Sequence, residues 1–138
     1  MKRCTKCGQL KNESEFHKCK TRLDGLHIWC KTCSSESQAN IQRRVRNRIE
    51  LLKRKCAKCG EGRVYLIEFH HIDPQEKQFE IGKAASLHIK EDLILTEIEK
   101  CVCLCANCHK EFHYIYKDDV NNPVDNLTEY LGRNPYDV

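Results

Sequence analysis

The sequence is poor in the residues that build a large hydrophobic core. Only 7% of its 138 residues are aromatic, whereas 32% are charged, and it contains 3 prolines. No apolar run is long enough to span a bilayer, so we expect neither a transmembrane helix nor a membrane partner. The opening residues, "MKRCTKCGQL", lack the apolar segment of a signal peptide, and we therefore expect a cytoplasmic protein.

Cysteine is the residue that the chain has in excess. Its 11 cysteines are an odd number, which fits poorly with a disulfide framework in a chain without an export signal. Eight of them form four C-x-x-C pairs, a pattern typical of metal binding. We expect two structural Zn²⁺ ions, each bound by four thiolates. The predicted ligands are Cys4, Cys7, Cys30 and Cys33 for the first ion, and Cys56, Cys59, Cys105 and Cys108 for the second.

Charge is divided unevenly along the chain. Residues 1–55 contain 15 Lys and Arg against 5 Asp and Glu, a net charge of +10. Residues 56–138 contain 9 against 15, a net charge of −6. Two zinc ions with four thiolates each would bring the formal total of +4 to roughly zero, but the asymmetry would remain. A basic half beside an acidic half suggests that one part holds a polyanion and the other carries the chemistry.

The predicted fold class is small α+β, stabilised by zinc. Residues 1–37 are expected to form an N-terminal zinc module, in which the thiolates of "CTKCG" turn around one ion and Gly8 relieves the tight turn. Phe16 and Trp29 are among the few apolar side chains that could pack around the metal. Zinc would therefore supply folding energy that the core cannot.

Residues 38–55 are predicted to form a basic linker helix. Ile41, Val45, Ile49 and Leu52 recur there at helical spacing. Cations around this stripe could follow a phosphate backbone, but a solvated helix face explains them equally well, so both interpretations stay open. The candidate DNA-binding residues are Arg43, Arg44, Arg46, Arg48, Lys53, Arg54 and Lys55.

The second half begins with "CAKCG", which repeats the first cysteine pair and its glycine. A strand is predicted over residues 63–72, rich in β-branched and aromatic side chains, and another over 101–105. Helices are predicted over residues 90–101 and 106–116. A short helix is expected over 123–132, with a proline near its start and a glycine near its end.

Histidines mark a further site. In "CANCHKEFH", His109 and His113 stand at i, i+4, so both imidazoles lie on one helix face and can bind the same metal. Four thiolates close a structural zinc site, whereas a histidine site with open positions suits a metal that must also hold a substrate. A third ligand must come from elsewhere, and the neighbouring His70 and His71 of "EFHHIDP" offer it.

The order C-x-x-C, a strand ending in paired histidines, then C-x-x-C-H-x-x-x-H resembles the HNH endonuclease family, whose site is a ββα-metal, treble-clef-like fold. The similarity covers Cys56 to about Tyr116, within an expected nuclease domain of residues 56–117. Residues 118–138 follow it as a C-terminal tail. Small phage-type members with an additional zinc module in front are the most similar.

This resemblance implies roles for the histidines. His70, His109 and His113 would bind a catalytic divalent metal, and His71 would be the general base that activates water. The metal would bind the phosphate and the leaving 3′-oxygen. A three-histidine site accepts Mg²⁺, Mn²⁺, Ni²⁺ or Zn²⁺, and their ranking stays open.

The implied activity is hydrolysis of phosphodiester bonds in duplex DNA to 5′-phosphate and 3′-hydroxyl ends. The implied location is the cytoplasm of a bacterial cell, either a phage host or the protein's own source. Whether the chain acts as a monomer or a homodimer stays open.

Two features depart from a simple match. The family has an asparagine about nine residues before the first helix histidine, which braces the loop that carries the base, and Lys100 stands there instead. Neighbouring side chains on a strand also point to opposite faces. We therefore expect the strand to end at His70 and the backbone to turn through His71, so that both imidazoles serve one site.

Other functions stay open. Lys100 favours a non-catalytic zinc-dependent nucleic-acid-binding protein, and a docking role for the tail would favour a protein-interaction adaptor. Cys19, Cys101 and Cys103 fall outside the pairs and are expected to be buried small residues, with Cys101 kept as an alternative zinc ligand. Glu68 or Asp73 could orient an imidazole, although Asp73 could equally shape a turn.

Overall fold

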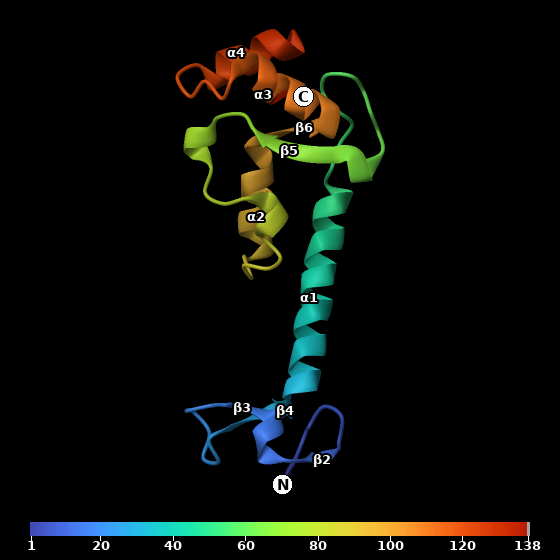
Figure 1. The fold of residues 1–138 in the computed structure, drawn as a ribbon, viewed down its shortest axis with the longest axis vertical. Coiled ribbons are helices and arrows are strands. Elements are labelled where there is room, and N and C mark those ends of the chain that lie inside the picture. Colours follow the sequence, from blue (N-terminus) through green and yellow to red (C-terminus); the bar gives the residue numbers. More distant parts are fainter. Residues whose placement is uncertain (138) are drawn as a thin grey trace. The chain divides into compact units, whose positions relative to one another are not determined.

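A computed structural model describes residues 1–137 of the chain. The chain divides into two compact units, Met1–Arg44 and a second that begins at Val45. The boundary falls within helix α1 (Lys31–Leu51) (Figure 1). Within residues 1–137, none of the helices combines the length and the apolarity needed to cross a membrane.

The first unit contains two small antiparallel hairpins followed by a helix. Strands β1 (Lys2–Arg3) and β2 (Leu10–Lys11) enclose the first C-x-x-C turn. Strands β3 (Phe16–Lys18) and β4 (Leu26–Cys30) form the second hairpin, and β4 runs directly into α1. This connection places Cys30 at the end of a strand and Cys33 in the first helical turn.

The core of the first unit consists almost entirely of the cysteine group. Cys4, Cys30 and Cys33 are buried there together with Phe16, and Trp29 packs against them. The expected packing of Trp29 on this group is confirmed. So small an apolar cluster stabilises a fold weakly on its own, in keeping with the zinc dependence expected from the sequence.

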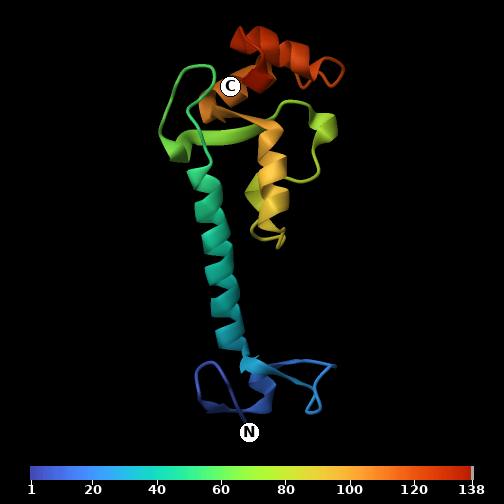
Figure 2. The same ribbon diagram turned by 180° about the vertical axis from the view of Figure 1, so that it is seen from behind.

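The second unit is built on a two-stranded antiparallel sheet and helices α2, α3 and α4, and it also includes the C-terminal part of α1. Strand β5 (Ile67–His71) pairs antiparallel with β6 (Cys101–Cys105), and α3 (Ala106–Tyr116) follows β6 without a break. Helix α2 (Glu91–Glu99) precedes β6, and α4 (Pro123–Leu131) packs beside α3 (Figure 2). Strand β6 and helices α2, α3 and α4 lie where the sequence predicts them, within one or two residues.

Two clusters of buried side chains hold the second unit together. One includes Ile67, Leu104 and Phe112 and also takes in Leu127 and Tyr130 of α4. The other joins Ile49, Ile81 and Ile94 with their neighbours. This unit therefore has apolar cores that do not consist of cysteines.

The two units repeat one pattern of backbone hydrogen bonds. In each, the glycine of the cysteine turn adopts a positive φ, and its N–H donates to the carbonyl of the first cysteine. The residue after that cysteine donates to the strand that carries the third cysteine. The paired distances are 2.9 and 2.9 Å for Gly8 N to Cys4 O and Gly60 N to Cys56 O, and 3.1 and 2.9 Å for Thr5 N to Ile28 O and Ala57 N to Cys103 O.

Helix α1 differs from the predicted linker helix at both ends. It begins at Lys31, before the predicted start, because the strand that carries Cys30 leads straight into it. It ends at Leu51, where N–H groups of the next two residues bond three residues back and tighten the last turn. The prediction that Lys53, Arg54 and Lys55 belong to this helix is wrong.

Candidate metal centres and active site

The structure brings together both predicted groups of four cysteines. In each group the four sulfur atoms lie within 4.8 Å of one another, three of the cysteines being buried and one exposed. A C-x-x-C turn supplies two sulfurs and a strand-to-helix junction supplies the other two. Four sulfurs at such distances match the donor set of a structural zinc site, so both groups could hold zinc. The groups are Cys4, Cys7, Cys30 and Cys33, and Cys56, Cys59, Cys105 and Cys108.

Proton affinities within these groups are split. Burial alone would raise the pKa of Cys4, but nearby backbone N–H groups outweigh it and lower the pKa to about 6. Burial and the neighbouring thiols raise the pKa of Cys33 to about 12. In the second group the pKa of Cys56 is lowered to about 7 against the effect of burial, and that of Cys108 is raised, chiefly by burial. When no cation lies among them, sulfurs this close do not all become thiolates together, because each negative charge raises the pKa of its neighbours.

The remaining cysteines stay outside these groups. The Cys101 thiol lies 3.5 Å from the Glu97 carbonyl oxygen, to which it donates, and burial raises its pKa to about 12. The Cys103 sulfur accepts from the backbone N–H of Arg54 at 3.4 Å. The structure therefore gives no support to Cys101 as an alternative zinc ligand.

A third cluster joins the predicted metal-binding histidines. His70 of β5 meets His109 and His113 of α3, and one ring nitrogen from each lies within 4.8 Å of the others. His70 Nδ1 is 3.0 Å from His109 Nε2. Two nitrogens about 2.1 Å from one ion lie roughly 3 Å apart, so His70 and His109 are spaced as two ligands of one ion are, and the three imidazoles could hold a metal.

Carboxylates orient both histidines of α3. Glu68 accepts a hydrogen bond from His109 Nδ1 at 2.5 Å, and Asp118 accepts one from His113 Nδ1. Each bond leaves the Nε2 lone pair of its imidazole directed away from the carboxylate. Such carboxylate–histidine pairs are typical of metal sites, where they fix the ring and strengthen the ligand. Glu68 thus has one of the roles expected for it, whereas Asp73 accepts from Gln75 N and shapes the turn after β5.

His70 is the buried member of the cluster. Burial, and after it the neighbouring imidazoles of His109 and His113, lower its pKa to about 3. At neutral pH the ring is therefore uncharged, and one of its nitrogens has a free lone pair. That state is the one that binds metal.

His71 lies on the other face of the strand. Strand β5 runs through His71, and Ile72 N still bonds to the Lys100 carbonyl beyond it. The prediction that the backbone turns through His71 is wrong. His70 points toward α3, whereas the His71 ring meets Glu97 of α2, as the alternation of strand side chains requires.

Glu97 is the polar residue of this site that the sequence analysis missed. Its side chain is almost fully buried, and His71, Gln78 and Lys100 all donate hydrogen bonds to its carboxylate. Burial alone would raise its pKa, but these donors outweigh burial and lower the pKa to about 2. A signal existed, because Glu97 falls on the same helix face as Ile94 and Ile98.

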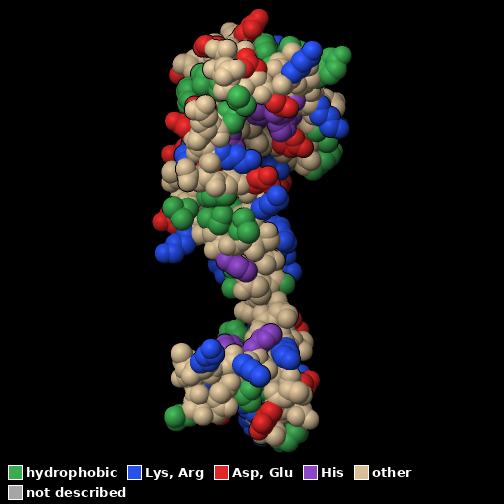
Figure 3. Space-filling model, turned by 60° about the vertical axis from the view of Figure 1, so that its left-hand side comes forward, with side chains coloured by type: hydrophobic (Ala, Val, Ile, Leu, Met, Phe, Trp, Pro, Cys, Tyr) green, Lys and Arg blue, Asp and Glu red, His purple; other side chains and the backbone are tan. Residues whose placement is uncertain are grey.

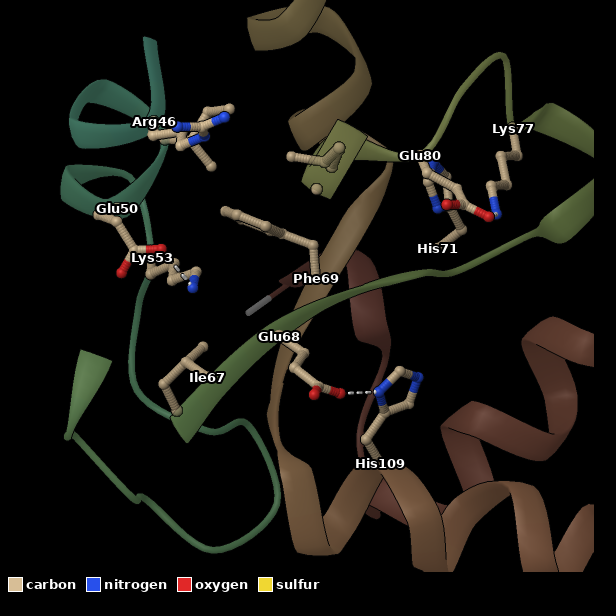
Figure 4. Close-up of a pocket in the computed structure, with 13 residues that line it drawn as sticks. Arg46, Glu50, Lys53, Ile67, Glu68, Phe69, His71, Lys77, Glu80 and His109 are labelled. Atoms are coloured by element: carbon tan, nitrogen blue, oxygen red, sulfur yellow. Dashed lines mark hydrogen bonds and ion pairs between the residues drawn. The ribbon is translucent and has the colours of Figure 1, made fainter. Parts of the chain in front are cut away.

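One cleft connects the two faces of β5. It has a volume of about 580 Å³ and is lined by Glu68, Phe69, His71 and His109, among others. Among residues 1–137, β5 pairs with β6 and with no other strand, so its other edge is unpaired, and residues of both strand faces line the cleft along that edge. Figure 4 shows Glu68 pointing at His109, with His71 farther along the strand. Histidine side chains also reach the surface of this unit beside acidic and basic ones (Figure 3).

The cleft lining carries balanced charge. Arg46, Lys53 and Lys77 contribute cations, and Glu50, Glu68 and Glu80 contribute carboxylates. Lys53 is paired with Glu50 at 2.7 Å, and Lys77 lies 3.8 Å from Glu80. An anion entering this cleft would meet little net positive charge from the protein alone.

The candidate DNA-binding cations are dispersed. Arg43 and Arg44 belong to the first unit, where Arg43 bonds to Asn40 at 2.8 Å. In the second unit Arg48 is paired with Glu91 at 2.9 Å. Arg46 and Lys53 line the cleft, whereas Arg54 and Lys55 line a different hollow beside Ile72 and Tyr136.

Comparison of the chain with known proteins gave no match to a family model, a curated protein or a solved structure.

Proposed function

We propose that the chain is a metal-dependent DNA endonuclease of the HNH type. One observation carries the proposal: a cluster of three imidazoles that fits a metal and a fourth histidine on the opposite strand face adjoin the same cleft. The phosphodiester to be cut would lie along the open edge of β5, between His109 and His71. Both faces of the strand could then act on one phosphate without a turn in the backbone.

The histidines divide the work by position. His70, His109 and His113 would hold a divalent metal, with Glu68 and Asp118 orienting the two rings of α3. When bound, such a metal supplies a Lewis acid that neutralises charge on the phosphate and the leaving oxygen. His71 would take the proton of the water that attacks phosphorus. The bond from phosphorus to the 3′-oxygen would break and that oxygen would gain a proton from solvent, which leaves 5′-phosphate and 3′-hydroxyl ends.

Electrostatics make the cleft's affinity for phosphate dependent on the metal. Without an ion, the three carboxylates of the lining offset its three cations. A divalent ion at the histidine cluster would make the cleft cationic, and anion binding there would then be favoured. Phosphate contacts outside the cleft would have to come from exposed cations, such as those of α1.

The test is nicking of supercoiled plasmid by zinc-loaded protein with added Mg²⁺, Mn²⁺ or Ni²⁺. Wild type is expected to nick, and His71→Ala to nick about 10²- to 10⁴-fold more slowly. His17→Ala, which removes an exposed imidazole of the first unit, is the matched control and should nick like wild type. The proposal is contradicted if wild type leaves the plasmid intact with every metal, or if His71→Ala nicks as fast as wild type.

A second candidate is a non-catalytic zinc-dependent nucleic-acid-binding protein. The observation that favours it is Lys100, in place of the asparagine that the HNH resemblance calls for. This alternative predicts salt-sensitive DNA binding without nicking, unchanged in His71→Ala. The same plasmid assay, followed by a filter-binding measurement, separates the two.

A further inference from the structure

We propose that Glu97, held in place by Lys100, is the positioning residue for His71 and takes over the bracing that the asparagine would give. This inference rests on the proposed function, because it concerns the histidine assigned there as the base. Glu97 lies in α2 and Lys100 is the C-terminal cap of that helix. The sequence pattern assigns neither residue to the positioning of His71.

The contacts of Glu97 are specific. Its Oε1 accepts from His71 Nε2 at 2.7 Å and from the backbone N–H of Gln78 at 2.8 Å. Its Oε2 accepts from Lys100 Nζ at 2.9 Å. With 1% of the residue exposed, the carboxylate has almost no access to water and is satisfied by these three donors.

These bonds determine which nitrogen of His71 carries a proton. An ionised carboxylate only accepts hydrogen bonds, so the nitrogen facing it, Nε2, must be the donor. In the neutral ring the lone pair is then on Nδ1, the nitrogen that does not bond to Glu97. A buried aspartate orients the histidine of serine proteases by the same logic.

Lys100 ties this arrangement to the strand. Its backbone carbonyl accepts from Ile72 N at 3.0 Å, directly after His71. Its ammonium group bonds to Glu97 and also donates to the Glu76 carbonyl at 3.0 Å. One residue therefore anchors the end of β5, the turn that follows it and the carboxylate that holds His71.

A buried carboxylate with two other donors could also serve stability alone. The arrangement differs from that case in one respect: the third donor is the side chain that lines the cleft beside His109. A stabilising role would act on folding, whereas a positioning role acts through His71. These alternatives make different predictions in variants.

The first arm of the experiment is nicking kinetics of the zinc-loaded full chain. Glu97→Gln is expected to lower kcat about 10- to 100-fold with little change in KM, as loss of an outer partner of a functional imidazole does. Lys100→Met should act in the same direction with a smaller loss. Glu99→Gln, an exposed carboxylate two positions along the same helix, is the matched control.

The double variant separates positioning from stability. If Glu97 acts through His71, adding Glu97→Gln to His71→Ala costs no further activity. The positioning role is overturned if the two losses multiply. It is also overturned if Glu97→Gln loses zinc or melts below the assay temperature but its remaining folded fraction has the wild-type kcat.

The second arm does not depend on cleavage. Long-range ¹H–¹⁵N NMR of the imidazoles should show neutral His71 with its proton on Nε2 in wild type, and a mixture of tautomers in Glu97→Gln. A wild-type His71 with its proton on Nδ1 would overturn the inference even if the protein nicks DNA. Conversely, a protein that never nicks but shows the Nε2 proton and its loss in Glu97→Gln would overturn the proposed activity and leave the positioning contact supported.

Discussion

The two units hold four cysteines in the same backbone arrangement but differ in the side chains that follow the last cysteine. Each has a cysteine turn, a two-stranded antiparallel sheet whose last strand runs into a helix, and the same backbone hydrogen bonds between turn and strand. Ser34 and Gln38 stand one and five residues after Cys33, as His109 and His113 do after Cys108. The first unit therefore has the scaffold of the second without the two helix imidazoles.

The strands explain a second difference. In the second unit β5 and β6 pair without interruption from Ile67 to His71, which carries His70 over the helix. In the first unit the register shifts between Phe16 and Lys18, so residues beyond Phe16 do not follow the same path. The comparison teaches that a shared four-cysteine frame gathers three histidines only where the strand register and the helix positions agree.

The largest expected effect separates the cores of the two units. Cys4→Ser should unfold the first unit, because a structural zinc site contributes about 10–16 kcal/mol and little else is buried there. Trp29, the single tryptophan, reports on this unit by fluorescence. Its emission should shift to the red, while circular dichroism retains the helices of the second unit.

Cys19→Ser is the matched control for that measurement, since Cys19 lies outside the four-cysteine group. Its emission should equal that of wild type. If Cys4→Ser also leaves the Trp29 emission unchanged, the first unit does not depend on its metal, and the contrast between the cores fails.

The next effect divides metal binding from proton transfer within the second unit. His113→Ala should lose the ion of the histidine cluster but keep two zinc ions per chain, because the thiolate groups are separate. His71→Ala should keep all three ions and still lose nicking. Metal analysis after dialysis, paired with plasmid nicking, measures both, and a His71→Ala variant lacking the third ion would contradict the division.

A smaller effect comes from giving the first unit the missing helix histidines. Ser34→His combined with Gln38→His places two imidazoles one helical turn apart in a hollow that His17 of β3 also lines, but without carboxylate partners such as Glu68 and Asp118. We expect weak Ni²⁺ binding by calorimetry, at least about tenfold weaker than at the histidine cluster of the second unit. Binding of equal strength would show that the carboxylates bonded to His109 and His113 contribute nothing to metal affinity.

The smallest effect compares cations of the two units in DNA binding. Arg44 is exposed, whereas Lys53 is mostly covered and paired with Glu50. Arg44→Ala should reduce the salt dependence of DNA binding by about one unit of slope, the value for one lost phosphate contact, and Lys53→Ala by less. The reverse order in a salt titration would place the DNA contacts on the second unit.

Much of the site could be predicted because its ligands follow short spacings. Two residues between thiolates and three between imidazoles determine which side chains share a turn or a helix face, whatever the rest of the fold. The structure accordingly brings together both cysteine groups and the three histidines expected to share an ion. Strand β6 and helices α2 to α4 were likewise accessible from hydrophobic pattern and turn residues.

The partner of His71 could not be predicted in the same way. Glu97 lies 26 residues away, and their contact depends on how α2 packs against the sheet of β5 and β6. The turn expected at His71 was inferred from the need to bring two imidazoles to one face. In the structure, residues of both strand faces reach one cleft at the unpaired edge of a two-stranded sheet. The number of strands in a sheet cannot be predicted from a local sequence pattern.

The most direct test of the account follows nicking as the third ion binds. Zinc-loaded protein is titrated with Co²⁺, whose absorption reports occupancy of the histidine cluster, and plasmid nicking is measured at each step. We expect the nicking rate to rise in proportion to the third ion and to stay at background with two ions per chain. Full-rate nicking at two ions, or none at three, would contradict the claim that the histidine cluster is the centre of a nuclease.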